Sequence, residues 1–300
     1  MQKSYKSKKP KEAQSIFPVT EACELMPFLL KSFPDKHRTK IKSLLAHRQV
    51  SVNDLVITQF NYPLQQGQTV SINYGYAPQT VRYNGLNIVF EDPHIIVIEK
   101  MPGILSVATD KQNDRTAYRI LSTHVKDEDP KNRIFVVHRL DREASGIMLF
   151  AKSMEVQEIL QKEWQESVIE RNYIAVVEGC VEKEEDTIIS NLTESKAYVM
   201  YSSKVPNEGQ RSVTHYKVLQ KNNDYSMLEV CLETGRKNQI RVHMKDIGHP
   251  IIGDKKYGSK INPINRVALH ARIIRFIHPI TKKELFFESS VPVKFLKLFS

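Results

Sequence analysis

The sequence predicts an α+β protein whose main domain is a mixed, mainly antiparallel sheet flanked by helices, preceded by a small α+β module. Short hydrophobic segments bounded by turn residues recur between residues 86 and 280, and several alternate apolar and polar side chains as half-buried strands do. Apolar residues at helical spacing occupy only a few short stretches. A chain of 300 residues is long enough for one large domain with a small one attached.

Composition places the chain among globular, basic proteins. The hydrophobic fraction is 41%, the charged fraction is 26%, and 44 Lys and Arg residues against 34 Asp and Glu residues give a net charge of +10. Clustered Lys and Arg side chains favour polyanionic partners because they release counterions from phosphate backbones. The charge alone does not identify the partner.

The cysteines indicate a reduced compartment, since Cys23, Cys180 and Cys231 are isolated and form neither a disulfide framework nor a zinc-ligand pattern. The lysine-rich N-terminus has no apolar stretch behind it and does not look like a secretory signal. No apolar run reaches the roughly 18 residues that a membrane span needs. We therefore expect a cytoplasmic protein without a membrane partner, acting as a monomer.

The N-terminal quarter is predicted to hold a basic arm and a small module. Residues 1–17 are polar, carry five lysines and are expected to be flexible. Apolar residues at helical spacing predict helices around 25–29 and 41–45, separated by the helix break at Phe33 and Pro34. A strand at 50–54 and a turn with a second strand at 64–70 follow.

Helix, helix and hairpin in this order resemble the S-four-like (alpha-L) RNA-binding module. The resemblance covers residues 18–74, although His37 and Asp54 stand where Ser and Gly are expected. It implies that basic side chains on and around the second helix contact RNA phosphates: Lys36, Arg38, Lys40, Lys42 and Arg48. Residues 75–85 are rich in turn-forming residues and are expected to be a linker.

The main domain is expected at residues 86–300, and its elements follow from local pattern. The pattern predicts a hairpin at 86–100, a helix at 155–166, strands at 170–179, 212–219 and 226–232, a helix after Thr234 and Gly235 with Arg236 in its first turn, and closing strands from 269. Amides in the first turn of such a helix suit a phosphate or carboxylate.

The stretch from 134 to 152 is predicted to be two buried strands joined by a polar turn. Apolar runs at 134–137 and 147–151 flank it. Arg139 and Asp141 are two residues apart, so in an extended chain their side chains point the same way and place a guanidinium beside a carboxylate. This pattern is compatible with a reacting group at a strand end and with a purely structural ion pair.

The run from His138 to Lys152 (HRLDREASGIMLFAK) resembles the signature of the RluA-type pseudouridine synthases, with Ala144 where Thr is usual. Three further segments are similar to motifs of this family. They are the turn after Lys100, with Met101 in place of Pro; the strand at 170–179 with Tyr173; and the segment 234–243, with Asn238 in place of His.

The resemblance implies an RNA enzyme that isomerises uridine to pseudouridine without a cofactor or a metal. Asp141 would be the catalytic carboxylate, and Arg241 would keep it ionised and oriented. Tyr173 and Ile240 would hold the uracil ring, and Arg139 would fill the gap that the extruded nucleotide leaves. Arg236 is a further candidate for contact with RNA. Since extrusion is least costly for unpaired nucleotides, we expect a target in a loop or junction.

Several alternatives stay open at this point. The N-terminal module favours ribosomal RNA of the large subunit as the target, and transfer RNA is the alternative within the family. A non-catalytic RNA-binding or ribosome-assembly protein with the same fold would not need the reacting carboxylate. A metal-dependent nuclease or phosphodiesterase would need carboxylates or histidines at ligand spacing, which the sequence does not show.

Overall fold

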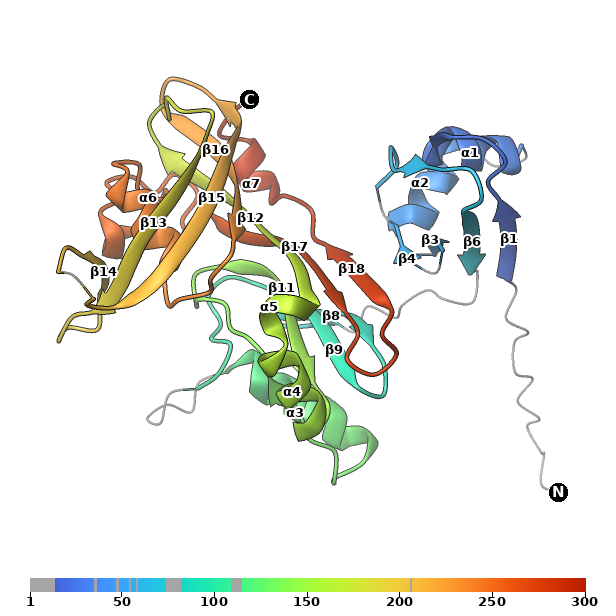
Figure 1. The fold of residues 1–300 in the computed structure, drawn as a ribbon, viewed down its shortest axis with the longest axis horizontal. Coiled ribbons are helices and arrows are strands. Elements are labelled where there is room, and N and C mark those ends of the chain that lie inside the picture. The colour runs from blue at the N-terminus through green and yellow to red at the C-terminus, as the bar shows by residue number, and fades with distance from the viewer. Residues whose placement is uncertain are drawn as a thin grey trace. The chain divides into compact units, whose positions relative to one another are not determined.

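The computed structural model describes residues 14–34, 37–46, 49–53, 55–57, 59–73, 82–108, 115–205 and 207–300. The chain forms two compact units: unit 1 is residues 1–79 with 284–286, and unit 2 is residues 80–283 with 287–300 (Figure 1). Most of the predicted arm at 1–17 and of the predicted linker at 75–85 lies outside the described residues. The domain boundaries given above therefore stay predictions.

Unit 1 contains, in chain order, β1 (Gln14–Pro18), β2 (Cys23–Glu24), α1 (Leu25–Ser32), α2 (Arg38–Ala46), β3 (Val50–Val52), β4 (Leu55–Val56), β5 (Pro63–Leu64) and β6 (Thr69–Asn73). Four strands form a sheet in the order β1-β6-β3-β4, and β2 pairs with β5. The apolar faces of both helices supply Leu25, Leu29, Ile41 and Leu45 to one core with strand residue Val70. The two helices thus form where helical spacing predicts them.

The end of the predicted flexible arm is a strand, which corrects the expectation for residues 14–17. β1 pairs antiparallel with β6, from Gln14 opposite Asn73 to Pro18 opposite Thr69. Phe17 packs against the core of unit 1, and its ring meets that of Phe33 edge-on at 4.8 Å. The first eleven residues are rich in lysine, so their composition predicted a flexible arm. The short strand that follows is paired with β6, more than fifty residues away, and local sequence does not show this pairing.

Unit 2 is built on one large sheet with helices packed against it, and the last strand of this sheet, at 284–288, starts with the three residues 284–286 that are assigned to unit 1. Its elements are β7 (Arg82–Tyr83), β8 (Leu86–Glu91), β9 (Ile95–Lys100), α3 (Ala117–Glu128), β10 (Phe135–Val136), β11 (Ser145–Ala151), α4 (Met154–Lys162), α5 (Trp164–Ser167), β12 (Val168–Glu178), β13 (Glu185–Glu194), β14 (Met200–Ser203), β15 (Gln210–Lys221), β16 (Tyr225–Leu232), α6 (Gln239–Asp246), η1 (Lys255–Tyr257), β17 (Leu269–Ile277), β18 (Glu284–Glu288) and α7 (Val293–Leu296).

The sheet of unit 2 has the strand order β14-β13-β15-β16-β12-β17-β11-β9-β8-β7, with β10 beside β11 and β18 beside β17. β9, β12, β15 and β16 each pair antiparallel with both neighbours, whereas β11 and β17 run parallel. The predicted fold class, an α+β protein with a mixed, mainly antiparallel sheet, is confirmed.

The parallel contact between β11 and β17 requires a glycine at its centre. Gly146 pairs with Ala271 and has a φ of +118°. A Cβ at position 146 would lie 2.1 Å from the carbonyl oxygen of Ala271, a distance that no side chain tolerates. Gly146 therefore allows β11 to begin directly after the polar turn that carries Asp141.

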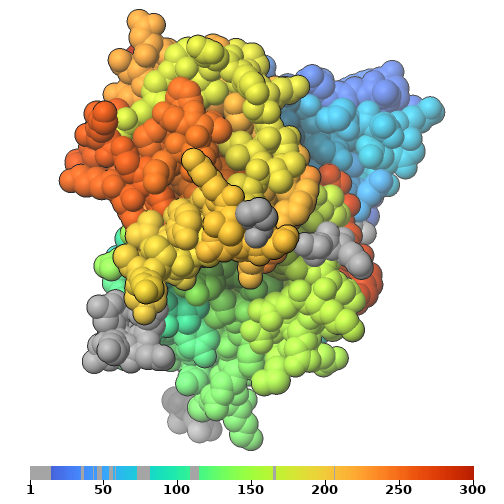
Figure 2. All heavy atoms as spheres, turned by 60° about the vertical axis from the view of Figure 1, so that its left-hand side comes forward, coloured from blue at the N-terminus to red at the C-terminus, as the bar shows by residue number. Residues whose placement is uncertain are grey.

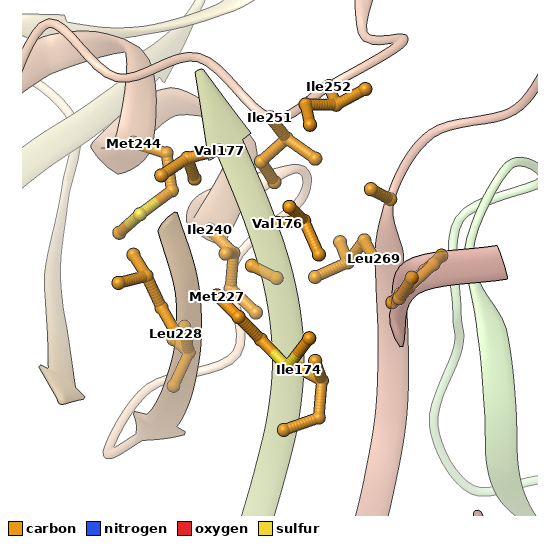
Figure 3. Close-up of a cluster of buried hydrophobic side chains, with 14 of the residues drawn as sticks. Ile174, Val176, Val177, Met227, Leu228, Ile240, Met244, Ile251, Ile252 and Leu269 are labelled. Carbon is orange, nitrogen blue, oxygen red and sulfur yellow. The ribbon is translucent and has the colours of Figure 1, made fainter. Parts of the chain in front are cut away.

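Two hydrophobic clusters stabilise the two halves of the sheet. The first joins β12, β16 and α6, and Figure 3 shows Ile174, Met227, Ile240 and Met244 of this cluster converging around β12. The second joins β8, β9, β11 and α3. In Figure 2 the yellow and orange segments around the first cluster and the cyan and green segments around the second form two adjoining regions of the surface. Tyr173 packs against both clusters, so it lies where the two halves meet.

None of the helices in the described ranges has both the length and the apolar character that crossing a membrane requires.

Candidate active site

Asp141 lies in the polar turn between β10 and β11, and hydrogen bonds from Ser106 hold this turn in place. The Ser106 hydroxyl accepts a hydrogen bond from the backbone N–H of Leu140 at 3.1 Å and donates to the carbonyl of the same residue at 2.7 Å. The side chain of Leu140 is buried, while that of Asp141 is 26% exposed. These two hydrogen bonds thus fix the backbone of Leu140 next to the partly exposed carboxylate of Asp141.

Lys100, the last residue of β9, supports the same turn from the core. Its side chain is fully buried, and its amine donates to the carbonyls of Met101, Ile104, Arg142 and Ala144. Burial lowers the pKa of Lys100 to about 8, and the nearby carboxylate of Asp141 opposes that shift. The buried amine ties the two loops at 101–104 and 142–144 together under the candidate carboxylate.

Arg241 is the cation that contacts Asp141. Its Nη1 lies 3.1 Å from Oδ2 of Asp141, and its Nε and Nη2 donate to Asp254 at 2.6 and 2.7 Å. The residue is 5% exposed, and its guanidinium lies over the ring of Tyr257, 4.9 Å from the ring centroid. Burial opposes the charge of Arg241, but the hydrogen bonds and charges of Asp254 and Asp141 outweigh it and raise the pKa of Arg241 above its usual range.

Asn238 completes the contacts of Asp141, at the position where the sequence departs from the family pattern. Its Nδ2 donates to Oδ2 of Asp141 at 2.7 Å, and its Oδ1 accepts from the Tyr257 hydroxyl at 3.1 Å. An amide therefore occupies the place next to the carboxylate, and it donates a hydrogen bond without titrating near neutral pH.

The helix that carries Arg241 begins later than predicted. α6 starts at Gln239, with Asn238 as its N-cap, so Arg236 lies before the helix and the predicted first-turn position is wrong. The Gln239 side chain accepts from Thr234 Oγ1 at 2.8 Å and from the Arg236 backbone N–H at 3.0 Å, and these bonds hold the preceding loop in a non-helical shape. The side chain of Arg236 is exposed, with Nε 3.5 Å from the Arg211 carbonyl.

Arg139 does not form the expected pair with Asp141. The chain between β10 and β11 is irregular, so the two side chains are not held on one face of a strand. Arg139 is exposed, and within the described part of the chain no hydrogen bond or ion pair joins it to Asp141. Sequence spacing suggested a cation from the same turn, whereas the cation comes from α6, 100 residues later.

Tyr173 and Ile240, the predicted base-holding residues, lie on β12 and α6. Tyr173 is partly buried between the two clusters of unit 2. Burial raises the pKa of its hydroxyl, Arg171 opposes this effect, and the carboxylate of Asp141 adds to it. Ile240 is 4% exposed and belongs to the cluster of Figure 3, so little of its side chain is open to a ligand.

The predicted RNA-contacting residues of unit 1 are only partly described. Arg38, Lys40 and Lys42 are exposed on α2, whereas Lys36 and Arg48 lie outside the described residues. The buried face of α2 is formed by Ile41 and its apolar neighbours. The three described cations are therefore accessible to solvent.

Sequence reasoning assigned no role to three residues that shape the site: Lys100, Asp254 and Tyr257. All three fall in segments that resemble family motifs or adjoin them, but each acts through contacts with residues far away in the sequence. The signal that could have found Asp254 and Tyr257 is their place in a run of glycines and charged residues, 253–258, which begins seven residues after the end of α6. A buried carboxylate there needs a cation, and Arg241 is one helix away.

One group among the described residues has the composition of a metal site, away from Asp141. The ligand atoms of Glu91, His124 and Glu128 lie within 4.8 Å of one another. Glu91 and His124 are already paired, at 2.7 Å with each other and through Lys152 and Tyr83. Glu91 and His124 thus have hydrogen-bond partners within the protein, and we assign no metal ion to this group.

Comparison with known proteins places the chain in a family. Residues 94–246 match the family model described as RNA pseudouridylate synthase. The chain is 31% identical over 269 residues to an uncharacterized RNA pseudouridine synthase, YhcT, of Bacillus subtilis, covering 88% of each chain. It is 32% identical over 283 residues to ribosomal large subunit pseudouridine synthase D of Vibrio cholerae, covering 87% of this chain and 85% of that one.

A solved structure shares the fold. It is that of human RNA pseudouridylate synthase domain containing 4, with a TM-score of 0.58 and 21% identity over 70% of this chain and 90% of that one. The fold of unit 2 is therefore the pseudouridine synthase fold. Together with the family match, this confirms the enzyme class predicted from the motifs, an isomerase that makes pseudouridine in RNA. The chain belongs to the RNA pseudouridylate synthase family and is of the RluA type.

Proposed function

We propose that this enzyme converts uridine to pseudouridine in ribosomal RNA of the large subunit, with Asp141 as the reacting carboxylate and without a cofactor. The observation that carries the proposal is the setting of Asp141. Its carboxylate is partly exposed, and two donors from α6 and its cap, Arg241 and Asn238, bind one of its oxygens.

The proposed reaction needs an ionised carboxylate from the protein and no cofactor. The bond between the ribose carbon and the base nitrogen breaks, the base turns, and a carbon of the base bonds to the ribose in its place. That carbon loses its proton and the freed nitrogen gains one, so no atom is gained or lost overall. Asp141 either attacks as a nucleophile or removes a proton from the ribose, and only the carboxylate form can do so. Arg241 donates a hydrogen bond to one oxygen of this carboxylate and so orients it.

Tyr173 is proposed to hold the target base. Base-aromatic stacking is worth about 1–3 kcal/mol, and the ring lies between the two halves of the sheet, close enough for the charge of Asp141 to affect its hydroxyl. Burial raises the pKa of its hydroxyl, so the group stays protonated near neutral pH. Ile240 is buried and is proposed to pack beneath the target base. Arg139 is exposed and is proposed to fill the space that the extruded nucleotide leaves.

The proposed target rests on relatives and on unit 1. Relatives that cover most of the chain are named ribosomal large subunit pseudouridine synthase D, in Vibrio cholerae and in Haemophilus influenzae among others. Unit 1 is proposed to be the S-four-like RNA-binding module, with Arg38, Lys40 and Lys42 exposed on α2. A module that binds structured RNA fits ribosomal RNA, and transfer RNA is the alternative target.

The test is to map pseudouridines in all RNA from cells with the protein, cells without it and cells that carry only Asp141→Asn. We expect one or a few sites in large-subunit ribosomal RNA to disappear in the last two. Loss confined to transfer RNA would replace the target and keep the mechanism. Unchanged modification in the Asp141→Asn cells would remove Asp141 from its role.

A further inference from the structure

Two donors meet on one oxygen of Asp141 and leave the other oxygen without a partner among the described residues. Nδ2 of Asn238 lies 2.7 Å from Oδ2, and Nη1 of Arg241 lies 3.1 Å from the same atom. A carboxylate has lone pairs on both oxygens, and an oxygen that already accepts two charge-assisted or polar hydrogen bonds is the weaker nucleophile. Oδ1 is thus the oxygen available to an incoming nucleotide.

The orientation of the Asn238 amide is fixed by a chain of hydrogen bonds. The backbone N–H of Met200 can only donate, so the Tyr257 hydroxyl accepts from it at 3.3 Å. The hydroxyl proton is then left to donate to Oδ1 of Asn238 at 3.1 Å. With its carbonyl engaged by Tyr257, Asn238 must turn its NH₂ group toward Asp141.

The backbone of Asn238 also suits this task. Asn238 has a φ of 54° and a ψ of 21°, in the left-handed region that asparagine adopts more readily than most residues. It caps α6, so its side chain is carried by the same element as Arg241, three residues later. The two donors to Asp141 therefore come from one element, α6 and its N-cap.

We propose that Asn238 is a positioning residue of this enzyme: its amide, oriented by Tyr257, fixes Oδ2 of Asp141 together with Arg241, so that Oδ1 is the oxygen that reacts with the nucleotide. This inference rests on the proposed role of Asp141 and adds which of its oxygens acts and what directs it. It assigns a function to the one residue of the third motif that departs from the family pattern at the site.

The charged and titratable groups around Asp141 make the donor's neutrality important. Arg241 comes from α6, Tyr257 from η1, Tyr173 from β12, Lys100 from β9, and Glu143 from the same turn, with its Oε2 3.5 Å from Nη1 of Arg241. The guanidinium of Arg241 already contacts the carboxylates of Asp141, Glu143 and Asp254. An amide adds a hydrogen bond to Asp141 without adding a charge or a titration.

The first test compares Asn238→Ala, Tyr257→Phe and the double variant in steady-state assays on RNA containing the target uridine. A hydrogen bond to a charged group is worth about 1.5–3 kcal/mol, so we expect Asn238→Ala to lower kcat roughly 10- to 100-fold with KM within about threefold. Tyr257→Phe should lower kcat roughly three- to tenfold. Because Tyr257 acts through Asn238, the double variant should be no slower than Asn238→Ala.

The second test uses Asn238→Asp, which keeps the shape and exchanges the donor for a second carboxylate. Two carboxylates at this distance share a proton at lower pH, and the protonated Asp then donates as the amide did. We expect the ratio of the variant's kcat to that of the parent enzyme to rise about tenfold between pH 8 and pH 6. A purely structural role would lower the ratio without making it depend on pH.

Asn265→Ala is the matched control, because Asn265 is exposed, has a similar φ of 57° and makes no side-chain hydrogen bond to the site among the described residues. It should change kcat less than twofold, and the melting temperature of each variant shows whether it is folded. If Asn238→Ala keeps kcat within twofold and Asn238→Asp has the parent's pH profile, Asn238 has no positioning role. Asp141→Asn is assayed beside these variants and tests the proposed function separately. If it is inactive while the Asn238 variants behave like the parent enzyme, the proposed function stands and the inference about Asn238 fails.

Discussion

Arg241 links a structural carboxylate to a reacting one. Asp254 is buried and holds the guanidinium through two hydrogen bonds, whereas Asp141 is partly exposed and receives one. Removing either partner would leave an uncompensated buried charge, which is strongly destabilising. The pair made with Asp254 therefore keeps Arg241 in place whether or not Asp141 carries its charge.

This arrangement predicts the effect of Asp141→Asn. The variant should fold normally and bind RNA within about twofold of the parent, because Arg241 keeps Asp254 as its partner. Product formation should fall by at least about 10⁴-fold, since an amide can neither attack nor remove a proton. Asp224→Asn, an exposed position at the β15–β16 turn, is the control and should have full activity. Turnover by Asp141→Asn within a hundredfold of the parent would contradict the assignment.

Lys100 predicts a pH dependence of stability. Its pKa is about 8 in the folded chain and near 10.5 unfolded, so between these values the unfolded chain binds more protons. Stability then rises with pH across that interval, because the cost of a buried ammonium is relieved as the amine loses its proton. The contribution is on the order of 3 kcal/mol when fully relieved.

The measurement is urea unfolding of the parent and of Lys100→Met at pH 7, 8.5 and 10. Met leaves four backbone carbonyls without their donor, so the variant should be less stable at every pH. The difference in the free energy of unfolding should widen toward pH 10. A difference that is constant, or that narrows, would show that the amine stays charged in the folded chain.

At the scale of elements, local pattern predicted most strands and helices, and distant contacts decided the exceptions. The sequence pattern predicted the strands β15 and β16, which the structure pairs, and helical spacing predicted α1 and α2. The start of α6 was misplaced because Gln239 binds the backbone of the preceding loop with its side chain, an interaction that periodicity does not encode. β1 was missed because its partner β6 lies far along the chain.

The same distinction applies to the site. Asp141 and Arg241 were predicted from motif resemblance, and the structure brings them together across 100 residues. Spacing alone would have paired Asp141 with Arg139, which the irregular turn keeps apart from it. A further network joins Arg241 to Asp254 and Asn238 to Tyr257. These contacts form only in the folded chain, so local sequence patterns do not predict them.

The junction of β11 and β17 predicts a large effect for Gly146→Ala. The new Cβ would lie 2.1 Å from a backbone oxygen at a φ of +118°, so the two strands must separate directly after the turn that bears Asp141. We expect a loss of about 3 kcal/mol or more in the free energy of unfolding, or failure to fold. Gly248→Ala, with a φ of +84° and open space around its Cβ, isolates the cost of the backbone conformation and should lose about 1–2 kcal/mol. Equal losses would rule out the steric explanation.

At the scale of the whole molecule, a net charge of +10 is divided between a catalytic unit and a small unit whose α2 exposes three cations. Charges that contact phosphates release counterions, and each contact adds about 0.7–0.9 to the steepness with which binding falls with salt. Charges that merely face solvent add nothing to it. Salt dependence therefore distinguishes an RNA-binding role of unit 1 from a solvated basic surface.

The prediction concerns the full chain with Arg38, Lys40 and Lys42 replaced by Gln. Each side chain is exposed, so the fold of unit 1 should be unchanged, while RNA affinity falls and the slope of log K against log salt becomes shallower by up to about 2 to 3. Replacing Lys126, Lys131 and Arg133 of unit 2 by Gln removes the same charge from other exposed positions and serves as the control. Binding titrations between 50 and 300 mM salt, roughly the range in which phosphate contacts dominate, measure both slopes. If the two triple variants shift the slope equally, the effect is one of net charge, and α2 makes no specific contact with RNA.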